Sequence, residues 1–245
     1  MRKFISVVAL LSVALFTASP AQAQPRRIVN SNGDFSWFIR ITSGDGAAGF
    51  VRGPNPTPIG TGSAHLSTGT QGDQSAEFRN TAFHGQRLAN LRDLSYSTFV
   101  LSNNGQQFPY LILHVDTNGD LVAEDLLFFE PPFQSPGNGG PTCADPSQPD
   151  TLLTTWQTWE ATLDNCWYGL DAATFAPSFA GPGIATQPLS DYVALNPNAR
   201  IVNPSGLGGI RLLVGFALAA DRFVSYVDNF TLQFGIYSRI FDFEL

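Results

Sequence analysis

Oxygen-bearing side chains are concentrated in a short segment near the middle of the chain, where they could hold a metal ion. Within ten residues the segment contains Asp116, Asn118, Asp120 and Asp125. Carboxylate and amide oxygens are the ligands that calcium prefers. The first three match the opening ligand positions of an EF-hand loop, but Leu127 stands where that loop needs a glutamate, and Gly119 is at the fourth position instead of the sixth. The segment is therefore not an EF-hand, and a calcium ion held by a loop between strands remains the hypothesis.

The same segment also predicts a β-hairpin. Asn118-Gly119 lies between "YLILHV" and "LVAEDLLFFE", and this dipeptide is typical of a two-residue type I′ turn. A hairpin and a bound ion are compatible. An ion at such a tip would stabilise the edge of the fold and would take no part in chemistry.

A further carboxylate, Asp228, interrupts an apolar pattern. The stretch "FVSYVDNFTLQF" alternates, so we expect one strand face to carry Val224, Tyr226, Phe230, Leu232 and Phe234. Asp228 falls on that same face, where an unpaired carboxylate is costly. It therefore either accepts backbone N–H groups or pairs with Arg211 or Arg222, or it is a structural calcium ligand.

Aromatic side chains cluster in "TTWQTWEATLDNCWYG", which contains Trp156, Trp159, Trp167 and Tyr168. An exposed tryptophan can stack on a sugar ring, so these residues are candidate glycan ligands. The alternative is packing in the core beside a disulfide. Because residues three apart face opposite sides of a strand, Trp156 and Trp159 cannot both be core residues unless a bulge intervenes.

Signatures of catalysis are largely missing. The three histidines are isolated, and neither H-E-x-x-H nor G-x-S-x-G occurs. "GLGGIR" opens a predicted strand, whereas a phosphate-binding loop opens a helix. The spacing of the glutamates does not indicate the carboxylate pair of a glycoside hydrolase. The sequence thus predicts a protein that is not an enzyme.

The first 23 residues predict export. Arg2 and Lys3 precede an apolar run at 5–16, and Ala21-Gln22-Ala23 has the pattern of a signal-peptidase site. The run is too short to span a bilayer. We expect a secreted or periplasmic protein that does not insert into the membrane after cleavage.

Charge and cysteine content agree with that location. After residue 23 the chain has 11 arginines, no lysine and 20 acidic residues, a net charge of −9. Such an acidic chain is a poor ligand for nucleic acid or an anionic membrane. Cys143 and Cys166 are the two cysteines, and an oxidising compartment predicts a disulfide between them.

The elements that must position these residues are short strands. The chain has 23 glycines and 17 prolines, and "YLILHV", "DLLFFE" and "GIRLLVGFAL" are apolar on both faces, as central strands are. "LSDYVALNP" predicts the one short helix, capped by Ser190 and followed by Pro197. The prediction is an all-β fold, an antiparallel β-sandwich or jelly roll, in a single domain over 24–245. A Pro/Gly-rich loop at about 131–150 would be tied to the domain by the disulfide.

Several motifs together resemble a family of exported bacterial β-sandwich proteins of unassigned activity. They include "GTGSAHL", "PYLILHVDTNGDLVAEDLLFFEP", "TWQTWEA", "LNPNARIVNPSGLGGIRLLVGF", "VSYVDNFTL" and "FDFEL". More distantly, "NGDF", "GSAHL" and "YVDNFTL" are similar to jelly-roll carbohydrate-binding modules with a galactose-binding-like fold. That resemblance implies a structural calcium at the position of Asp228.

The first functional hypothesis is therefore a non-catalytic module that binds a polysaccharide or cell-surface glycan and contains a structural calcium. A structural or adhesive envelope protein with a protein partner is the second hypothesis. A polysaccharide-active hydrolase or lyase on the same sandwich is the third.

Overall fold

A computed structural model describes residues 25–42, 45–70, 74–138, 140–141, 143, 148–216 and 222–245. The predicted signal peptide at 1–23 lies outside the described residues. Within them, no helix has the length and apolar character needed to cross a membrane.

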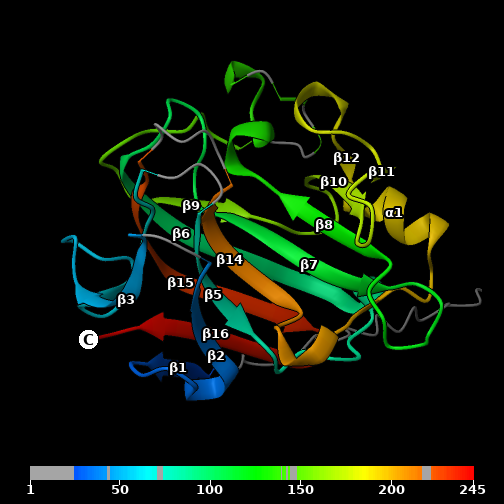
Figure 1. Cartoon of the computed structure of the whole chain (residues 1–245), viewed down its shortest axis with the longest axis horizontal. Coiled ribbons are helices and arrows are strands. Elements are labelled where there is room, and N and C mark those ends of the chain that lie inside the picture. The colour runs from blue at the N-terminus through cyan, green and yellow to red at the C-terminus, as the bar shows by residue number, and fades with distance from the viewer. Residues whose placement is uncertain are drawn as a thin grey trace, which may run out of the picture.

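The strands form two sheets (Figure 1). The seven-stranded sheet comprises β1 (Arg26–Val29), β3 (Ala47–Arg52), β4 (Gly62–Ser67), β6 (Leu91–Ser102), β9 (Gln157–Glu160), β15 (Val224–Phe234) and β16 (Tyr237–Phe243). Its order is β1-β16-β15-β4-β3, and β6 pairs with both β15 and β9. Strand β1 runs parallel to β16, whereas the other described ladders of this sheet are antiparallel.

The second sheet has nine strands in the order β11-β10-β8-β7-β14-β5-β2, with β12 beside β10 and β13 beside β7. They are β2 (Trp37–Ile41), β5 (Ser75–Asn80), β7 (Tyr110–Asp116), β8 (Asp125–Phe129), β10 (Cys166–Asp171), β11 (Pro177–Phe179), β12 (Gln187–Pro188), β13 (Arg200–Ile201) and β14 (Ile210–Gly215). The described helices are α1 (Leu189–Leu195) and the 3₁₀ turns η1 (Asp34–Ser36), η2 (Leu88–Asn90), η3 (Pro131–Gln134), η4 (Pro136–Asn138), η5 (Gly183–Ala185) and η6 (Pro204–Gly206).

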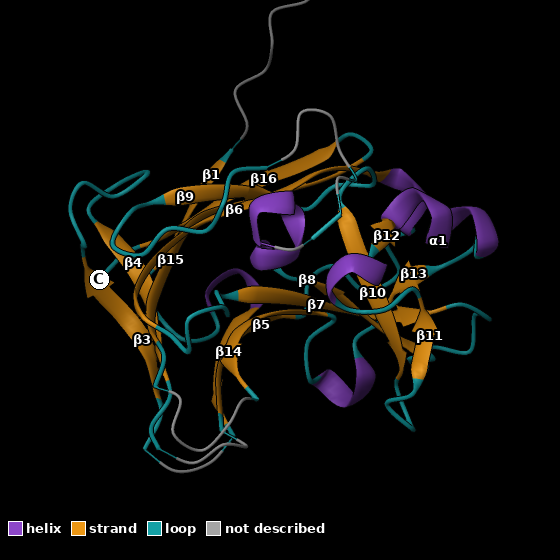
Figure 2. Ribbon diagram, turned by 90° about the horizontal axis from the view of Figure 1, so that it is seen from above, coloured by secondary structure: helices purple, strands orange, loops and turns teal. Residues whose placement is uncertain are grey.

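The two sheets lie face to face as the layers of a sandwich (Figure 2). One hydrophobic core fills the space between them, with side chains from both sheets. Its largest fully buried members include Trp37, Phe78, Phe129, Trp159, Trp167, Phe230 and Phe243. The edge of the Trp37 ring meets the Phe230 ring with centroids 5.0 Å apart, a favoured aromatic geometry. The predicted all-β sandwich with one short helix is confirmed.

A bulge in β15 changes which side chains face the core, so the predicted face is confirmed after the bulge and wrong before it. Asn229 has a positive φ of 51°, and the register with β6 shifts between Asp228 and Thr231. Beyond this shift Phe230, Leu232 and Phe234 point into the core. Before it, Val227 is the core residue, while Val224 and Tyr226 face outward with the parity of Asp228.

Strands β7 and β8 form the predicted hairpin, but the predicted two-residue turn is wrong. Val115 pairs with Asp125, so the connection is long. Positive φ occurs at Gly119 (92°) and Leu121 (70°), and Asn118 is not among the positive-φ residues. A type I′ turn needs positive φ at two consecutive residues. Backbone N–H groups that bond to the Asp116 carboxylate shape the wider loop.

Helix α1 lies at the predicted place, but Ser190 does not cap it. The N-cap is Pro188, and no side chain caps the helix. Its first N–H groups are instead satisfied through tertiary contacts. The N–H of Leu189 donates to the carbonyl of Asn165 at 3.2 Å, and that of Ser190 donates to the carbonyl of Leu163 at 2.7 Å. Tertiary partners therefore replace the side-chain cap.

The predicted disulfide between Cys143 and Cys166 is present, with a Cα–Cα distance of 5.3 Å. Cys166 begins β10. The bond therefore ties the Pro/Gly-rich segment to the nine-stranded sheet, as expected.

Candidate functional site

The outer face of the nine-stranded sheet carries an ordered row of side chains. In β7, Leu111 and Leu113 belong to the core, so Ile112 between them points to the opposite, outer face. Across the sheet, cross-strand pairing places these outward residues in line: Phe38, Arg79, Arg211, Ile112, Phe128 and Tyr168. They come from six strands spread over most of the chain.

A groove of about 430 Å³ lies along this row, which we call the outer groove. Its floor consists of Tyr110, Ile112, Leu126, Phe128, Tyr168 and Leu170. The rings of Phe128 and Tyr168 stack in parallel with centroids 4.9 Å apart, and Tyr110 stacks on the other side of Phe128 at 6.4 Å. The floor is therefore largely apolar, and ring stacking holds the orientation of its three aromatic side chains.

Two exposed phenylalanines stand at the rim of the outer groove. Phe175 is 65% exposed and Phe216 is 51% exposed. Both have a φ of 56°, a conformation that costs a bulky residue about 1–3 kcal/mol. Phe175 follows the end of β10, and Phe216 follows the end of β14. The register places these ends at opposite ends of β7, so the two rings lie diagonally across the groove.

The backbone of each rim phenylalanine is held in place. The N–H of Phe175 donates to the carbonyl of Asp171 at 2.9 Å, and the N–H of Phe216 donates to the carbonyl of Gln74 at 2.9 Å. A Cβ on Gly215 would lie 2.1 Å from the carbonyl oxygen of Gln74, so only glycine permits this close approach. Exposed apolar rings held in strained backbone are a feature of binding sites.

A carboxyl group lines the groove beside this floor. Burial raises the pKa of Glu130, and the hydrogen bond from the Tyr168 hydroxyl, 2.6 Å from Oε1, lowers it in part. No cation lies within 4 Å of this carboxyl among the described residues. Glu130 can therefore donate as an acid or accept a hydrogen bond from a ligand hydroxyl.

Ionised groups occupy the centre of the row. The Glu77 carboxylate accepts Nε and Nη2 hydrogen bonds from both Arg79 and Arg211, at 2.6–3.0 Å. Burial alone would raise the pKa of Glu77, but the hydrogen bonds and charges of the two guanidinium groups outweigh it and lower the pKa to about 2. Arg211 also lines the outer groove.

Two of the predicted glycan-binding aromatics are core residues instead. Trp159 and Trp167 are 0% exposed, so the prediction that they stack on a sugar is wrong. The Trp159 Nε1 donates to the Thr98 hydroxyl at 2.8 Å, and the Trp167 Nε1 donates to the Thr162 carbonyl at 3.3 Å. Strand alternation turns both rings inward from β9 and β10.

The other two predicted aromatics are in different places. Tyr168 lies in the floor of the outer groove. Trp156 is half-buried beside the seven-stranded sheet. Its ring centroid lies 5.7 Å from that of Phe99 in β6, and its Nε1 donates to the Pro54 carbonyl at 2.9 Å. Phe175 and Phe216 could not be predicted from the sequence as site residues, because isolated phenylalanines beside turns carry no periodic signal.

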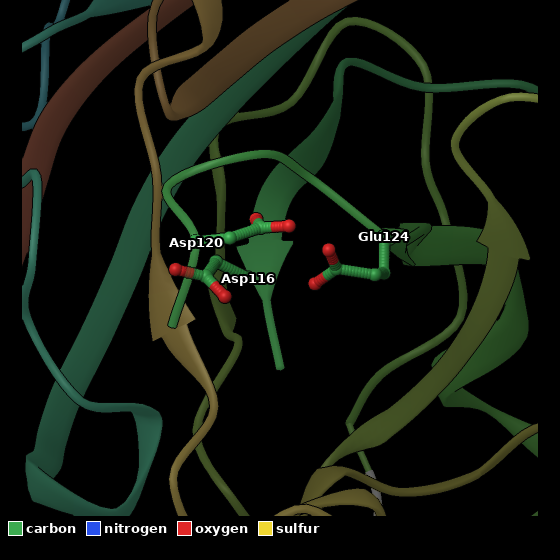
Figure 3. Close-up of side chains that lie close together, drawn as sticks. All are labelled: Asp116, Asp120 and Glu124. Carbon is green, nitrogen blue, oxygen red and sulfur yellow. The ribbon is translucent and has the colours of Figure 1, made fainter. Parts of the chain in front are cut away.

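The β7–β8 connection gathers the predicted metal ligands in part (Figure 3). We call 116–124 the acidic loop. Oxygens of Asp116, Asp120 and Glu124 lie within 4.8 Å of one another. Asp116 is fully buried and accepts the N–H groups of Asn118, Gly119 and Leu121 at 2.6–3.1 Å. Three carboxylates at this spacing fit a divalent cation with oxygen ligands.

The remaining side chains of the segment have other partners. The Asn118 amide bridges the cluster, donating to Asp120 at 3.2 Å and to Glu124 at 2.8 Å. Asp125 lies outside the cluster because its carboxylate accepts the Tyr192 hydroxyl at 2.6 Å. Glu124, which was not among the predicted ligands, stands at the ninth position of the EF-hand pattern, itself a ligand position.

Asp228 lies in the other sheet from the acidic loop and is fully buried. Its carboxylate accepts the N–H of Ile59 at 3.2 Å and of Phe243 at 3.1 Å, as predicted in the first of the three alternatives. Burial raises its pKa to about 7, although the backbone hydrogen bonds lower it in part. Asp228 thus joins the loop before β4 to the last strand.

A second hollow, of about 380 Å³, lies at the β1–β16 edge. Its lining includes Arg27, Phe35, Tyr237 and Arg239. This edge hollow shares no residue with the outer groove.

Comparisons of the chain with protein-family models, curated proteins and solved structures find no match.

Proposed function

We propose that this protein is an exported, non-catalytic β-sandwich protein that binds a glycan in the outer groove. The observation that carries the proposal is the pair of exposed rings, Phe175 and Phe216, that line one groove together with an aromatic floor. Ligand sites are mostly apolar with a few placed polar groups. Gln107, Glu130 and Arg211 supply those groups here.

The shape of the surface supports a chain-like ligand. The row of outward side chains crosses six strands, and adjacent strands are ~4.8 Å apart, so it extends over roughly 24 Å. A surface of this length accommodates several sugar units end to end. The acidic loop lies beyond the end of β7, and we propose that it holds a structural calcium which orders the β7–β8 connection.

Retention on immobilised polysaccharides tests the glycan proposal. We expect Phe175→Ala and Phe216→Ala each to weaken binding about tenfold, equivalent to ~1.4 kcal/mol, because each removes an exposed stacking surface. Both side chains are largely exposed, so the thermal midpoint should change little.

Tyr237→Ala is the matched control, since Tyr237 is a 64% exposed ring in the edge hollow. It should leave retention unchanged. Failure of the wild-type protein to bind any glycan would remove the proposal, and loss of binding only in the Tyr237 variant would move the site to the edge hollow.

One observation favours a second candidate, an enzyme that cleaves a polysaccharide. Glu130 is a carboxyl with a raised pKa beside the groove, as a general acid would be. Assays for new reducing ends and for unsaturated products discriminate the two candidates. Product formation that disappears in Glu130→Gln, with binding retained, would favour the enzyme.

A further inference from the structure

The centre of the outer row carries more positive than negative charge. One carboxylate, Glu77, is shared by two guanidinium groups, Arg79 and Arg211. All three side chains are buried or nearly so. Buried charges are normally balanced by a partner, so one positive charge in this group lacks a counterion among the described residues.

Of the two guanidinium groups, the one that lines the outer groove is that of Arg211. Arg79 uses its remaining nitrogen, Nη1, to donate to the Leu207 carbonyl at 2.9 Å. Arg211 uses Nε and Nη2 for Glu77, and its Nη1 has no hydrogen-bond partner among the described residues. Because Arg211 lines the groove, we infer that this nitrogen is the donor offered to a ligand there.

The surroundings do not neutralise this charge. Arg40 adds a further positive charge on the same face, directly across from Glu77 on the neighbouring strand. Glu130 lines the same groove but forms no ion pair with Arg211, whose carboxylate partner is Glu77. A cationic centre is therefore set into the surface of a protein with an overall net charge of −7. Such a local field concentrates anions.

We propose that the glycan bound in the outer groove is acidic, with a carboxylate or sulfate group placed against Nη1 of Arg211. This inference rests on the proposed glycan-binding function and specifies its ligand class. The negative charge of the substituent neutralises the remaining positive charge of the Glu77–Arg79–Arg211 group. The sugar ring lies on the apolar floor between Phe175 and Phe216.

Affinity electrophoresis of the mature protein tests the charge requirement. The carboxylate arm compares polygalacturonate and alginate with the same polymers after carboxyl reduction, and the sulfate arm compares dextran sulfate with dextran. We expect at least one charged polymer to bind tenfold or more tightly than its neutral counterpart at physiological salt. The arm in which this occurs identifies the charged group.

Arg211→Gln then locates the charge. Glu77 and Arg79 remain as a balanced pair in this variant, so we expect it to stay folded and to lose at least tenfold in affinity for the charged polymer. Its affinity for the neutral counterpart should be unchanged. Arg27→Gln is the matched control, because Arg27 belongs to the edge hollow, and it should bind as the wild type does.

Each contrary outcome has a distinct meaning. Equal binding of charged and neutral polymers would overturn the inference and leave the proposed function standing. Absence of binding to every polymer would overturn both. If Arg211→Gln did not fold, the wild-type comparison of charged and neutral polymers would still decide. A loss of charge preference in Arg27→Gln, with Arg211→Gln unaffected, would also overturn the assignment.

Discussion

Asp228 shows how a single buried carboxyl can make stability depend on pH. Its pKa rises from 3.8 to about 7 on folding, because burial penalises the charged form. The folded protein therefore binds this proton more tightly than the unfolded chain does. The resulting stabilisation is complete below pH 4 and is lost as the pH rises to about 7.

We therefore expect Asp228→Asn to remove a slope from the pH dependence of stability. In the wild type, this group should lower the free energy of unfolding by about 1.4 kcal/mol per pH unit between pH 4 and 7. Asparagine does not titrate, so the variant should lack that contribution. It should be less stable than the wild type at pH 4, because its amide can accept only one of the two N–H groups from Ile59 and Phe243.

Urea unfolding at several pH values measures the difference between the two proteins. Glu77 does not contribute to the slope between pH 5 and 7. Its pKa is lowered from 4.5 to about 2, so its stabilising effect changes with pH only below pH 4.5. Identical slopes for wild type and variant between pH 5 and 7 would contradict the assignment to Asp228.

At the scale of an element, the acidic loop is wider than the predicted two-residue turn, and its backbone folds around the Asp116 carboxylate. The buried Asp116 fixes three backbone N–H groups, so its first task is structural. Asp120 and Glu124 are more accessible and bring two further carboxylates to the same point. Like charges this close repel one another unless a cation lies between them.

Calcium should consequently stabilise the protein through this loop. At a calcium concentration 100 times the dissociation constant, the gain is ~2.7 kcal/mol, which appears as an increase of several degrees in the thermal midpoint. Asp120→Asn and Glu124→Gln should each reduce this increase, because each removes a ligand carboxylate. Thermal unfolding with calcium and with chelator provides the measurement.

The control for the calcium experiment is Asp164→Asn, since Asp164 is an exposed acid outside the loop. It should preserve the full response. If calcium left the wild-type midpoint unchanged, the metal proposal would be wrong, whereas an equal loss in all three variants would indicate a non-specific charge effect.

For the whole molecule, the shape of the outer groove depends on the nine-stranded sheet, whose inner face packs against the other sheet. Strand residues that line the groove come from β7, β8, β10 and β14, and each of these strands also contributes inward residues to the shared core. The disulfide adds a covalent link between the Pro/Gly-rich segment and β10. Since β10 also pairs with β8 over four residues, its place in the groove does not depend on the disulfide alone.

Replacing both cysteines with serine should therefore lower stability and preserve binding. A loop of 23 residues closed by Cys143 and Cys166 contributes ~3 kcal/mol in the chain-entropy account. Chemical denaturation measures this loss. Reducing agent should produce a similar loss in the wild type and none in the double variant, and a variant that is folded but does not bind glycan would contradict the expected independence of the groove.

Local patterns were sufficient for the fold class and for part of the acidic loop. Apolar runs such as "YLILHV" predicted that β7 is a central strand, since such strands are apolar on both faces. The predicted signal peptide and the two cysteines predicted the disulfide. The position of α1 followed from its pattern, but its first N–H groups found partners in 163–165, a contact that local sequence does not contain.

By itself, the sequence determined that this chain is an all-β sandwich with a short helix, a disulfide and an acidic β7–β8 connection. These properties depend on residue type and on period-two spacing, both of which are local. Only the tertiary structure decided that Trp159 and Trp167 are core, that a bulge at Asn229 turns Asp228 away from the core face, and that Phe175, Phe216 and Arg211 meet in one groove. Such facts depend on strand register and on pairing between distant segments, which neighbouring residues do not encode.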